Sequence, residues 1–321
     1  MRLIRPILLL SLLAAGTVQA GPLREMLQER RAERQAAVQA DGRDDELAGT
    51  RRMAPARVPP GVEVARDVAY GPDRAQRVDV YTPQAGTRDA PVIVMVHGGG
   101  WKRGDKSMQA VVENKAARWV ARGVVFVSVD YRMLPEADVA AQAADVARAV
   151  AYVQAHAAEW GGDGGQVILM GHSAGAHLVA LLTSSSRLVR EHGVQPWLGT
   201  VALDSAAFDV GTIMRSRHFG LYDEAFGTDP AYWRTASPID GLAGAAPPLL
   251  AVCSSRRATS CEQARAYAQK AAGIGSRVQV EPERLSHREI NAELGLAGAY
   301  TDAVERFMSG LGPGIAARLA R

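Results

Sequence analysis

The hydrophobic pattern divides the chain at about Val62, where short apolar or alternating segments begin to be separated by longer segments with helical spacing. Pro91–His97 is apolar almost throughout, which is typical of a strand covered on both faces. Ala137–Trp160 is long and rich in alanine, which is typical of a helix. The pattern predicts strands at Asp67–Tyr70, Arg77–Thr82, Pro91–His97, Val124–Val129, Gln166–Met170, Thr200–Leu203, Pro248–Val252 and Arg277–Glu281. It predicts helices at Asn114–Arg122, Ala137–Trp160, Ala174–Ser184, Glu262–Ala272 and, in the main, Ile290–Met308.

This alternation of strands and helices predicts an α/β fold, with a mostly parallel central sheet and helices on both faces. The segment 206–246 breaks the alternation, because it carries many aromatic residues but little strand pattern. It lies between the sixth and seventh predicted strands, so we expect an insertion above the sheet. Such an insertion acts either as a lid over a pocket or as a packed surface piece.

The first twenty residues have the pattern of a secretory leader. Arg2 and Arg5 precede the apolar run Ile7–Ala15, and Val18 and Ala20 supply the small residues that a signal peptidase accepts. The apolar run is too short for a membrane span, which needs about 20 residues. We therefore predict a signal peptide that is cleaved after Ala20, with no integral membrane span in the mature protein.

Three segments follow from this assignment. Residues 1–20 are the predicted signal peptide, residues 21–60 a charged arm, and residues 61–321 the folded domain. The mature protein is expected in the periplasm or outside the cell. Because that environment is oxidising, the two cysteines of the chain, Cys253 and Cys261, are candidates for a disulfide.

Composition and charge exclude several functions. The 321 residues include 37 Lys and Arg against 34 Asp and Glu, a net charge of +3, and the predicted mature chain is closer to neutral without Arg2 and Arg5. A net charge this small does not indicate the excess of basic residues that binding to nucleic acid requires. Two cysteines cannot form a four-thiolate zinc site, and we predict no metal.

A serine lies at a sharp turn between a predicted strand and a predicted helix. The segment Gly171-His172-Ser173-Ala174-Gly175 matches the G-x-S-x-G pattern of a nucleophile elbow. Such a turn exposes the hydroxyl at a helix start, where the helix dipole favours developing negative charge. Ser173 is therefore the predicted nucleophile.

A glycine-rich loop follows the apolar strand Pro91–His97. Glycines let backbone N–H groups approach a substrate closely, and a carbonyl under attack needs such preorganised donors. No phosphate-binding glycine motif is present. We predict that Gly98 and Gly99 donate to an oxyanion, together with the N–H of Ala174 in the elbow.

Together these motifs resemble the α/β-hydrolase superfamily, and most closely its esterase branch with an HGGGW loop, which includes feruloyl- and acetyl-esterase-like and formamidase-like enzymes. The resemblance covers about Val62 to Ser309, and the segment 130–135 is similar to the DYRLxP segment of that branch. It implies the α/β-hydrolase fold and a serine hydrolase for small acyl esters that needs no cofactor. It makes no prediction of the oligomeric state.

One of the seven histidines has the position that the resemblance implies for the general base. His287 lies between the last predicted strand and the last helix, in a segment that resembles the loop carrying the catalytic histidine of the branch. We expect it to accept the serine proton. Of the others, His156 and His192 are interpreted as surface residues, and His177 as a residue that packs or forms hydrogen bonds. We expect His97 to support the glycine loop, while His172 lies within the elbow and His218 in the insertion.

The acid departs from the family pattern. In this branch it usually follows the strand before the last, but residues 253–262 contain no aspartate and Arg257 stands at about the expected position. The preferred candidate is Asp204, which follows the preceding strand. Asp209 and Glu262 remain alternatives, as does the absence of any acid.

The sequence thus predicts an exported serine hydrolase that cleaves carboxylic esters through an acyl-enzyme on Ser173, with His287 as base and Asp204 as acid. An amide or formamide hydrolase would use the same groups. A catalytically impaired binding protein of the same fold is the alternative that the missing aspartate favours.

Overall fold

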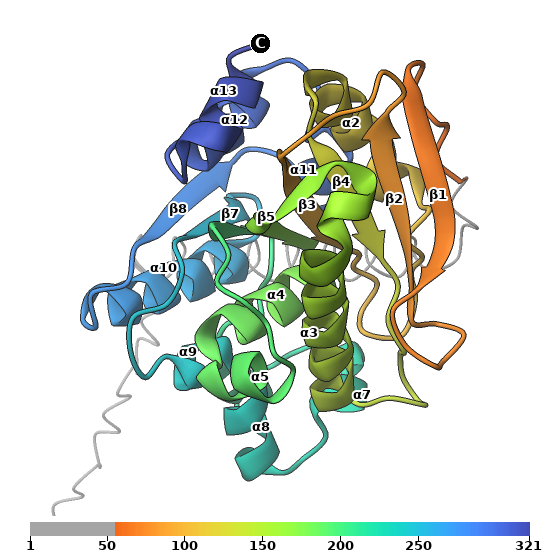
Figure 1. Ribbon diagram of the computed structural model, residues 1–321. Helices are drawn as coiled ribbons and strands as arrows, with labels where there is room; N and C mark the ends of the chain where they lie inside the picture. Colours follow the sequence, from red (N-terminus) through yellow and green to blue (C-terminus); the bar gives the residue numbers. More distant parts are fainter. Residues whose placement is uncertain (1–54) are drawn as a thin grey trace, which may run out of the picture.

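The computed structural model describes residues 55–321 (Figure 1). The predicted signal peptide and the predicted arm as far as residue 54 lie outside the described residues. No helix within residues 55–321 is long and apolar enough to cross a membrane.

The domain is built on an eight-stranded sheet with the order β1-β2-β4-β3-β5-β6-β7-β8. β1 pairs antiparallel with β2 and β2 antiparallel with β4, whereas every pairing from β4 through β3 to β8 is parallel. The mostly parallel sheet is therefore confirmed. The strands are β1 (Val62–Ala69), β2 (Arg77–Pro83), β3 (Ala90–Val96), β4 (Val125–Val129), β5 (Gly162–His172), β6 (Gly199–Leu203), β7 (Leu249–Ser254) and β8 (Val278–Glu283).

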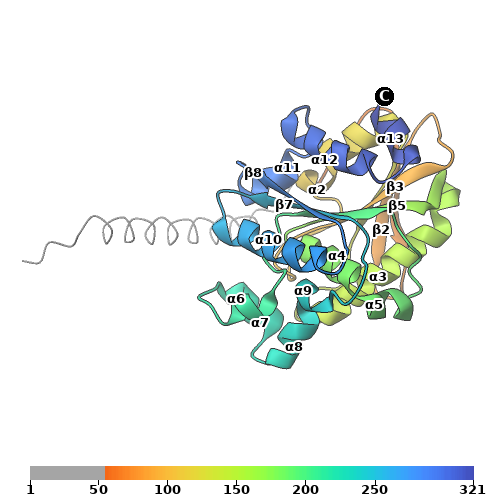
Figure 2. The same cartoon turned by 90° about the vertical axis from the view of Figure 1, so that its left-hand side faces the viewer.

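Helices cover both faces of the sheet, as the sequence predicts (Figure 2). One face is packed by α2 (Gln109–Trp119), α11 (His287–Ala292), α12 (Ala299–Ser309) and α13 (Pro313–Leu319). The other is packed by α3 (Val139–His156), α4 (Ala174–Ser184), α5 (Ser186–Glu191) and α10 (Ala258–Ala272). Two short 3₁₀ helices, η1 (Val120–Arg122) and η2 (Ala157–Trp160), extend α2 and α3.

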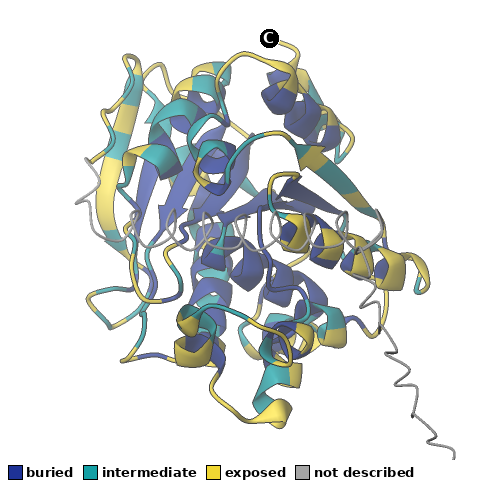
Figure 3. Ribbon diagram, turned by 180° about the vertical axis from the view of Figure 1, so that it is seen from behind, coloured by how far each residue is buried: buried dark blue, intermediate teal, exposed yellow. Residues whose placement is uncertain are grey.

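The continuous apolar run of β3 follows from its central position. Val92, Val94 and Val96 belong to the core under α3 and α4, while Ile93 and Met95 belong to the core under α2 and α12. Because side chains alternate along a strand, a strand between two helical layers must be apolar at every position. The edge strand β1 has no such cover and is exposed along much of its length (Figure 3).

Between β6 and β7 the chain leaves the sheet, which confirms the predicted place of an insertion. It forms four short helices: α6 (Val210–Met214), α7 (Gly220–Phe226), α8 (Pro230–Ala236) and α9 (Pro238–Gly241). In Figure 2 they lie beyond α3 and α4, on the side of the sheet opposite α12. The buried side chain of Phe226 belongs to the same core as α3 and α4. Action as a lid stays a prediction.

Candidate active site

Ser173 occupies the turn between β5 and α4 with φ 55° and ψ −119°, a conformation that is costly for a residue with a side chain. Its N–H donates to Leu203 O at 2.9 Å, which ties the turn to β6. The flanking glycines are sterically required: a Cβ on Gly171 would overlap the backbone of Gly175, and one on Gly175 would overlap the carbonyl of Val96. The sequence therefore folds into a strained elbow that leaves Ser173 partly exposed at the carboxyl edge of the sheet.

The glycine loop after β3 lies directly against this elbow. A Cβ on Gly98 would come within 2.7 Å of His172 O and 2.8 Å of the Ser173 Cβ, distances that real Cβ atoms do not adopt. Gly99 has φ +124°, in the region that favours glycine. His97 fixes the start of the loop by donating from Nδ1 to Gly98 O at 2.8 Å. The loop backbone is thus held beside Ser173 and the start of α4, and its role as an oxyanion hole stays a prediction.

A chain of hydrogen bonds links this loop to the insertion. Trp101 donates from Nε1 to His177 Nδ1 at 3.2 Å, so His177 must donate from Nε2 to Ala236 O at 2.7 Å. Burial lowers the pKa of His177 to about 4, which keeps the ring neutral. The loop on β3, the elbow helix α4 and the end of α8 are therefore held in one network.

His287 is the first residue of α11, and a capping box formed by Ser286 and Glu289 fixes the start of that helix. Its buried ring lies 4.5 Å from the ring of His172, measured between centroids, and His172 Nε2 donates to His287 O at 2.9 Å. Burial, with His287 as the next cause, lowers the pKa of His172 to about 3. His172 is therefore neutral and packs behind the candidate base.

Asp204 reaches His287 from the end of β6. Its Oδ2 lies 2.7 Å from His287 Nδ1, and its Oδ1 accepts from Ser254 N at 2.7 Å and from the Ser260 hydroxyl. Burial alone would raise the pKa of this carboxyl, but the charge of Arg257 and the bonds from His287 and Ser254 outweigh it and hold the pKa well below its ordinary value. A buried, ionised carboxylate thus faces Nδ1 of the histidine.

The other two acid candidates have different surroundings. Asp209 caps α6, accepting from Thr212 N at 2.9 Å and from the Thr212 hydroxyl at 2.7 Å. Glu262 is exposed on α10. The structure therefore brings Asp204, and not the capping Asp209, into contact with His287. That Asp204 acts as the acid of the reaction stays a prediction.

Arg257 takes part in this site, and sequence reasoning assigned it no role. Its Nη1 lies 2.7 Å from Asp204 Oδ2 and is in close contact with His287 Nδ1. The sequence does hold a signal for this role. Arg257 stands at about the position expected for the acid, and the candidate acid, Asp204, follows the neighbouring strand instead. A disulfide between Cys253 and Cys261 closes the loop that carries Arg257.

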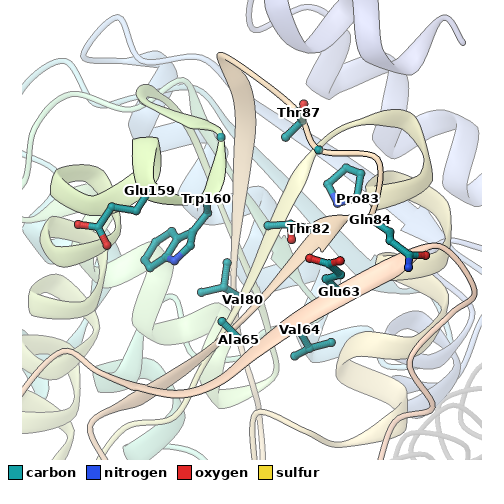
Figure 4. A pocket seen from close by; sticks show the side chains of 12 residues that line it. Glu63, Val64, Ala65, Val80, Thr82, Pro83, Gln84, Thr87, Glu159 and Trp160 are labelled. Atoms are coloured by element: carbon teal, nitrogen blue, oxygen red, sulfur yellow. The ribbon is translucent and has the colours of Figure 1, made fainter.

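The site opens into a narrow cavity of about 20 Å³, to which Ser173, Asp204 and Arg257 contribute. A larger cavity of about 470 Å³ lies among β1, β2 and η2 (Figure 4). It is unrelated to the elbow, because Trp160 and Gly161 on its wall precede β5 whereas Ser173 follows that strand. Within residues 55–321, no cluster of His, Cys, Asp and Glu side chains is arranged to hold a metal ion.

Comparison with known proteins gives concordant matches. A family model described as BD-FAE matches residues 78–192. The chain is 30% identical over 250 residues to Esterase LipC of Mycobacterium tuberculosis (strain ATCC 25618 / H37Rv), covering 71% of this chain and 61% of LipC. It is 32% identical over 130 residues to the probable isoprenylcysteine alpha-carbonyl methylesterase ICMEL1 of Arabidopsis thaliana, covering 40% of this chain and 26% of that protein.

A solved structure shares the fold. Esterase B from Lactobacillus Rhamnosis (HN001) superimposes with a TM-score of 0.65 at 19% identity, covering 89% of this chain and 96% of that one. The chain spans less than two thirds of the length of the curated relatives named above. The fold and these matches support an α/β-hydrolase of the carboxylesterase type.

Proposed function

We propose that this protein is a serine esterase that cleaves small carboxylic esters through an acyl-enzyme on Ser173. The observation that carries the proposal is the 2.7 Å contact between His287 Nδ1 and the buried carboxylate of Asp204, at the edge of the sheet where the elbow lies. A histidine oriented by a carboxylate is the base that a serine nucleophile requires. The printed descriptions of LipC as an esterase and of ICMEL1 as a methylesterase support an ester substrate.

In the proposed reaction, Ser173 Oγ attacks the acyl carbon while His287 Nε2 accepts the serine proton. This requires the proton on Nδ1 to point at Asp204, which fixes the tautomer and stabilises the imidazolium that forms. The N–H groups of Gly98, Gly99 and Ala174 are the proposed donors to the oxyanion. His287 then gives its proton to the leaving alcohol, and a water molecule activated by the same histidine releases the acid and restores Ser173.

The test compares hydrolysis of p-nitrophenyl acetate and butyrate by the protein from Gly21 with that of three variants. Ser173→Ala should reduce turnover to the uncatalysed background. Asp204→Asn should lower kcat by at least about a hundredfold, because loss of such a carboxylate costs on the order of 10⁴ in a serine protease. Asp209→Asn is the matched control, since asparagine also caps a helix well and Asp209 contacts Thr212 rather than His287.

A second readout separates catalysis from folding. A phosphonate ester should label the wild type rapidly and add its mass to the peptide containing Ser173, and His287→Asn should label slowly. If the wild type neither labels nor exceeds Ser173→Ala with acetate, longer esters and anilides, the esterase proposal is wrong. The binding-protein alternative would then lead.

We further propose that the chain is exported and begins at Gly21 after cleavage. Support comes from the leader pattern of the first twenty residues and from the disulfide between Cys253 and Cys261, which an oxidising compartment favours. Expression of the full chain in a bacterial host, followed by fractionation and mass measurement of the N-terminal peptide, tests it. An intact Met1 in the cytoplasmic fraction would contradict the proposal.

A further inference from the structure

A guanidinium lies where the candidate acid and base meet. Arg257 Nη1 lies 2.7 Å from Asp204 Oδ2 and in close contact with His287 Nδ1, while Asp204 Oδ2 is 2.7 Å from the same nitrogen of His287. The Arg257 side chain is 9% exposed and that of Asp204 is fully buried, so bulk water screens neither charge effectively. Two nitrogen donors, one of them on a cation, therefore converge on one carboxylate oxygen.

A cation in this position acts on its two neighbours in opposite senses. It favours the ionised carboxylate of Asp204, whose pKa is already held low in spite of burial. It disfavours a second positive charge on His287, because like charges at close range repel. The pair alone would favour the imidazolium, whereas the three groups together favour a neutral imidazole beside an ionised carboxylate.

The loop that carries Arg257 is built to keep this contact. The disulfide between Cys253 at the end of β7 and Cys261 in α10 closes the loop. The same loop supplies the N–H of Ser254 and the hydroxyl of Ser260 to the other oxygen of Asp204. Both oxygens of the carboxylate are thus oriented by one closed segment, which leaves Oδ2 facing Arg257 and His287.

We propose that Arg257 is a positioning residue of the esterase site: it turns Asp204 toward His287 and keeps His287 in its neutral, proton-accepting form to lower pH than Asp204 alone would allow. This inference rests on the proposed function. Arg257 thus stands at about the position that the resemblance gives to the acid, and there it acts on the protonation of His287.

Other titratable groups packed around α11 and Asp204 do not duplicate this contact. Burial lowers the pKa of His172 to about 3 and raises that of Tyr300 well above its usual range, so both are neutral near pH 7. Of the neighbouring cations, Lys115 contacts Asn291 and Arg256 pairs with Glu289. The charges that act on His172 and Tyr300 are those of His287, Asp204, Lys115, Glu283 and Glu293, and the charges of Arg256 and Glu289 pair with each other.

The experiment is the pH profile of kcat/KM for p-nitrophenyl butyrate in wild type and Arg257→Gln. Loss of the cation should move the acidic limb of the kcat/KM profile, where His287 becomes protonated, to higher pH by about one unit. The reason is that an adjacent charge shifts a pKa by one to three units. Arg257→Lys should return the limb most of the way to wild type. A purely structural arginine would lower activity at every pH and leave the limb in place.

Two further variants keep the test sharp. Arg265→Gln removes one positive charge from an exposed position on α10 and should keep the wild-type limb. Arg257→Met keeps the apolar stem without the charge and should shift the limb as the glutamine variant does, so the proposal stays testable if one of the two does not fold. A limb that stays in place, or moves to lower pH, in the folded variants overturns the proposal.

A second readout does not depend on turnover. NMR titration of the His287 ring, assigned by comparison with His287→Asn, should give a higher pKa in Arg257→Gln than in wild type. If wild type shows no hydrolysis but the ring pKa rises as expected, the esterase proposal fails while the action of Arg257 on His287 stands. If hydrolysis is normal and neither the ring pKa nor the limb moves, only the Arg257 proposal fails.

Discussion

At the scale of single residues, the site depends on backbone positions that exclude even a methyl group. The Cβ that alanine would add at Gly98 falls 2.7 Å from His172 O and 2.8 Å from the Ser173 Cβ. Both neighbours belong to the strained elbow and cannot move without displacing Ser173. The glycine loop and the serine turn therefore behave as one unit.

We accordingly predict that Gly98→Ala lowers kcat for p-nitrophenyl acetate by about 10²–10³, the range for loss of one oxyanion donor. Gly244→Ala is the control, because a Cβ there meets nothing within 4 Å. Kinetics and thermal melting of both variants check the prediction. Activity of Gly98→Ala within a few-fold of wild type would mean that the loop does not contact the reacting carbonyl.

At the scale of elements, a buried lysine joins α2 to the helix that begins with His287. Lys115 is 1% exposed and donates from Nζ to Ala110 O at 2.8 Å, Asn291 O at 2.5 Å and Asn291 Oδ1 at 3.0 Å. It therefore satisfies acceptors at the end of α11, which its backbone leaves open. Burial lowers the pKa of Lys115 to about 7 from its ordinary value of 10.5.

This shift predicts a pH-dependent stability. Between about pH 7 and 10.5 the unfolded chain binds a proton at Lys115 that the folded chain does not, so the free energy of unfolding rises with pH across that window. Below pH 7 both states are protonated and the cost of burying the charge is fully present. The rise from pH 7 to 9 should be about 2–3 kcal/mol, at 1.36 kcal/mol per unit.

Urea unfolding at a series of pH values measures this slope. Lys115→Met should remove most of the rise, because methionine does not titrate. Lys270→Met, at an exposed position on α10, should retain it. Equal slopes in wild type and Lys115→Met would contradict the assignment.

The elements that the sequence predicted well are those buried on both faces. The β3 strand carries an unmistakable apolar run because two helical layers cover it, whereas the edge strand β1 begins at Val62 rather than Asp67 because half-covered positions give a weak pattern. The predicted helix Ile290–Met308 is two helices, α11 and α12, since Gly295 and Gly298 adopt φ +104° and +156° between them. The short helices α5 and α13 were not predicted.

The parts of the candidate site that one chain segment forms could be predicted, but the contacts between distant segments could not. The elbow and the glycine loop each consist of consecutive residues, so the spacing of glycine and serine along the chain is enough to predict them. The contact among Asp204, Arg257 and His287 joins the ends of three elements, β6, β7 and α11. The sequence does not give the register of the sheet. It therefore favours Asp204 over Asp209 and Glu262 as the acid without deciding among them, and it predicts no role for Arg257.

At the scale of the whole molecule, the insertion forms one wall of the cavity at Ser173. Leu221 and Tyr222 of α7 line it together with Gly100 and Trp101 of the glycine loop. Its volume of about 20 Å³ is little more than one water molecule needs, so we expect that only a short acyl group enters it. The packing of the insertion against the sheet should therefore set substrate length.

We predict a preference of the wild type for acetate and butyrate over octanoate esters. Tyr222→Ala should raise the octanoate-to-acetate ratio of kcat/KM at least about tenfold, since each methylene admitted to an apolar pocket contributes about 1–3 kcal/mol. Tyr232→Ala, on α8 and away from the cavity wall, is the control. An unchanged chain-length profile in Tyr222→Ala would show that the acyl group binds elsewhere.

The position of Asp204 also determines whether the insertion can be exchanged without disturbing the candidate site. Asp204 lies at the end of β6, and the chain runs from it through Ser205, Ala206 and Ala207 along the cavity wall into the insertion. The insertion and the proposed acid therefore share one continuous stretch of chain. A graft of residues 206–246 would begin two residues after Asp204, the proposed acid, and would alter the backbone next to it. Chimeras should tolerate foreign insertions only when the junction is set beyond Ala207, and directed evolution of the cavity wall should select compensating changes next to Asp204.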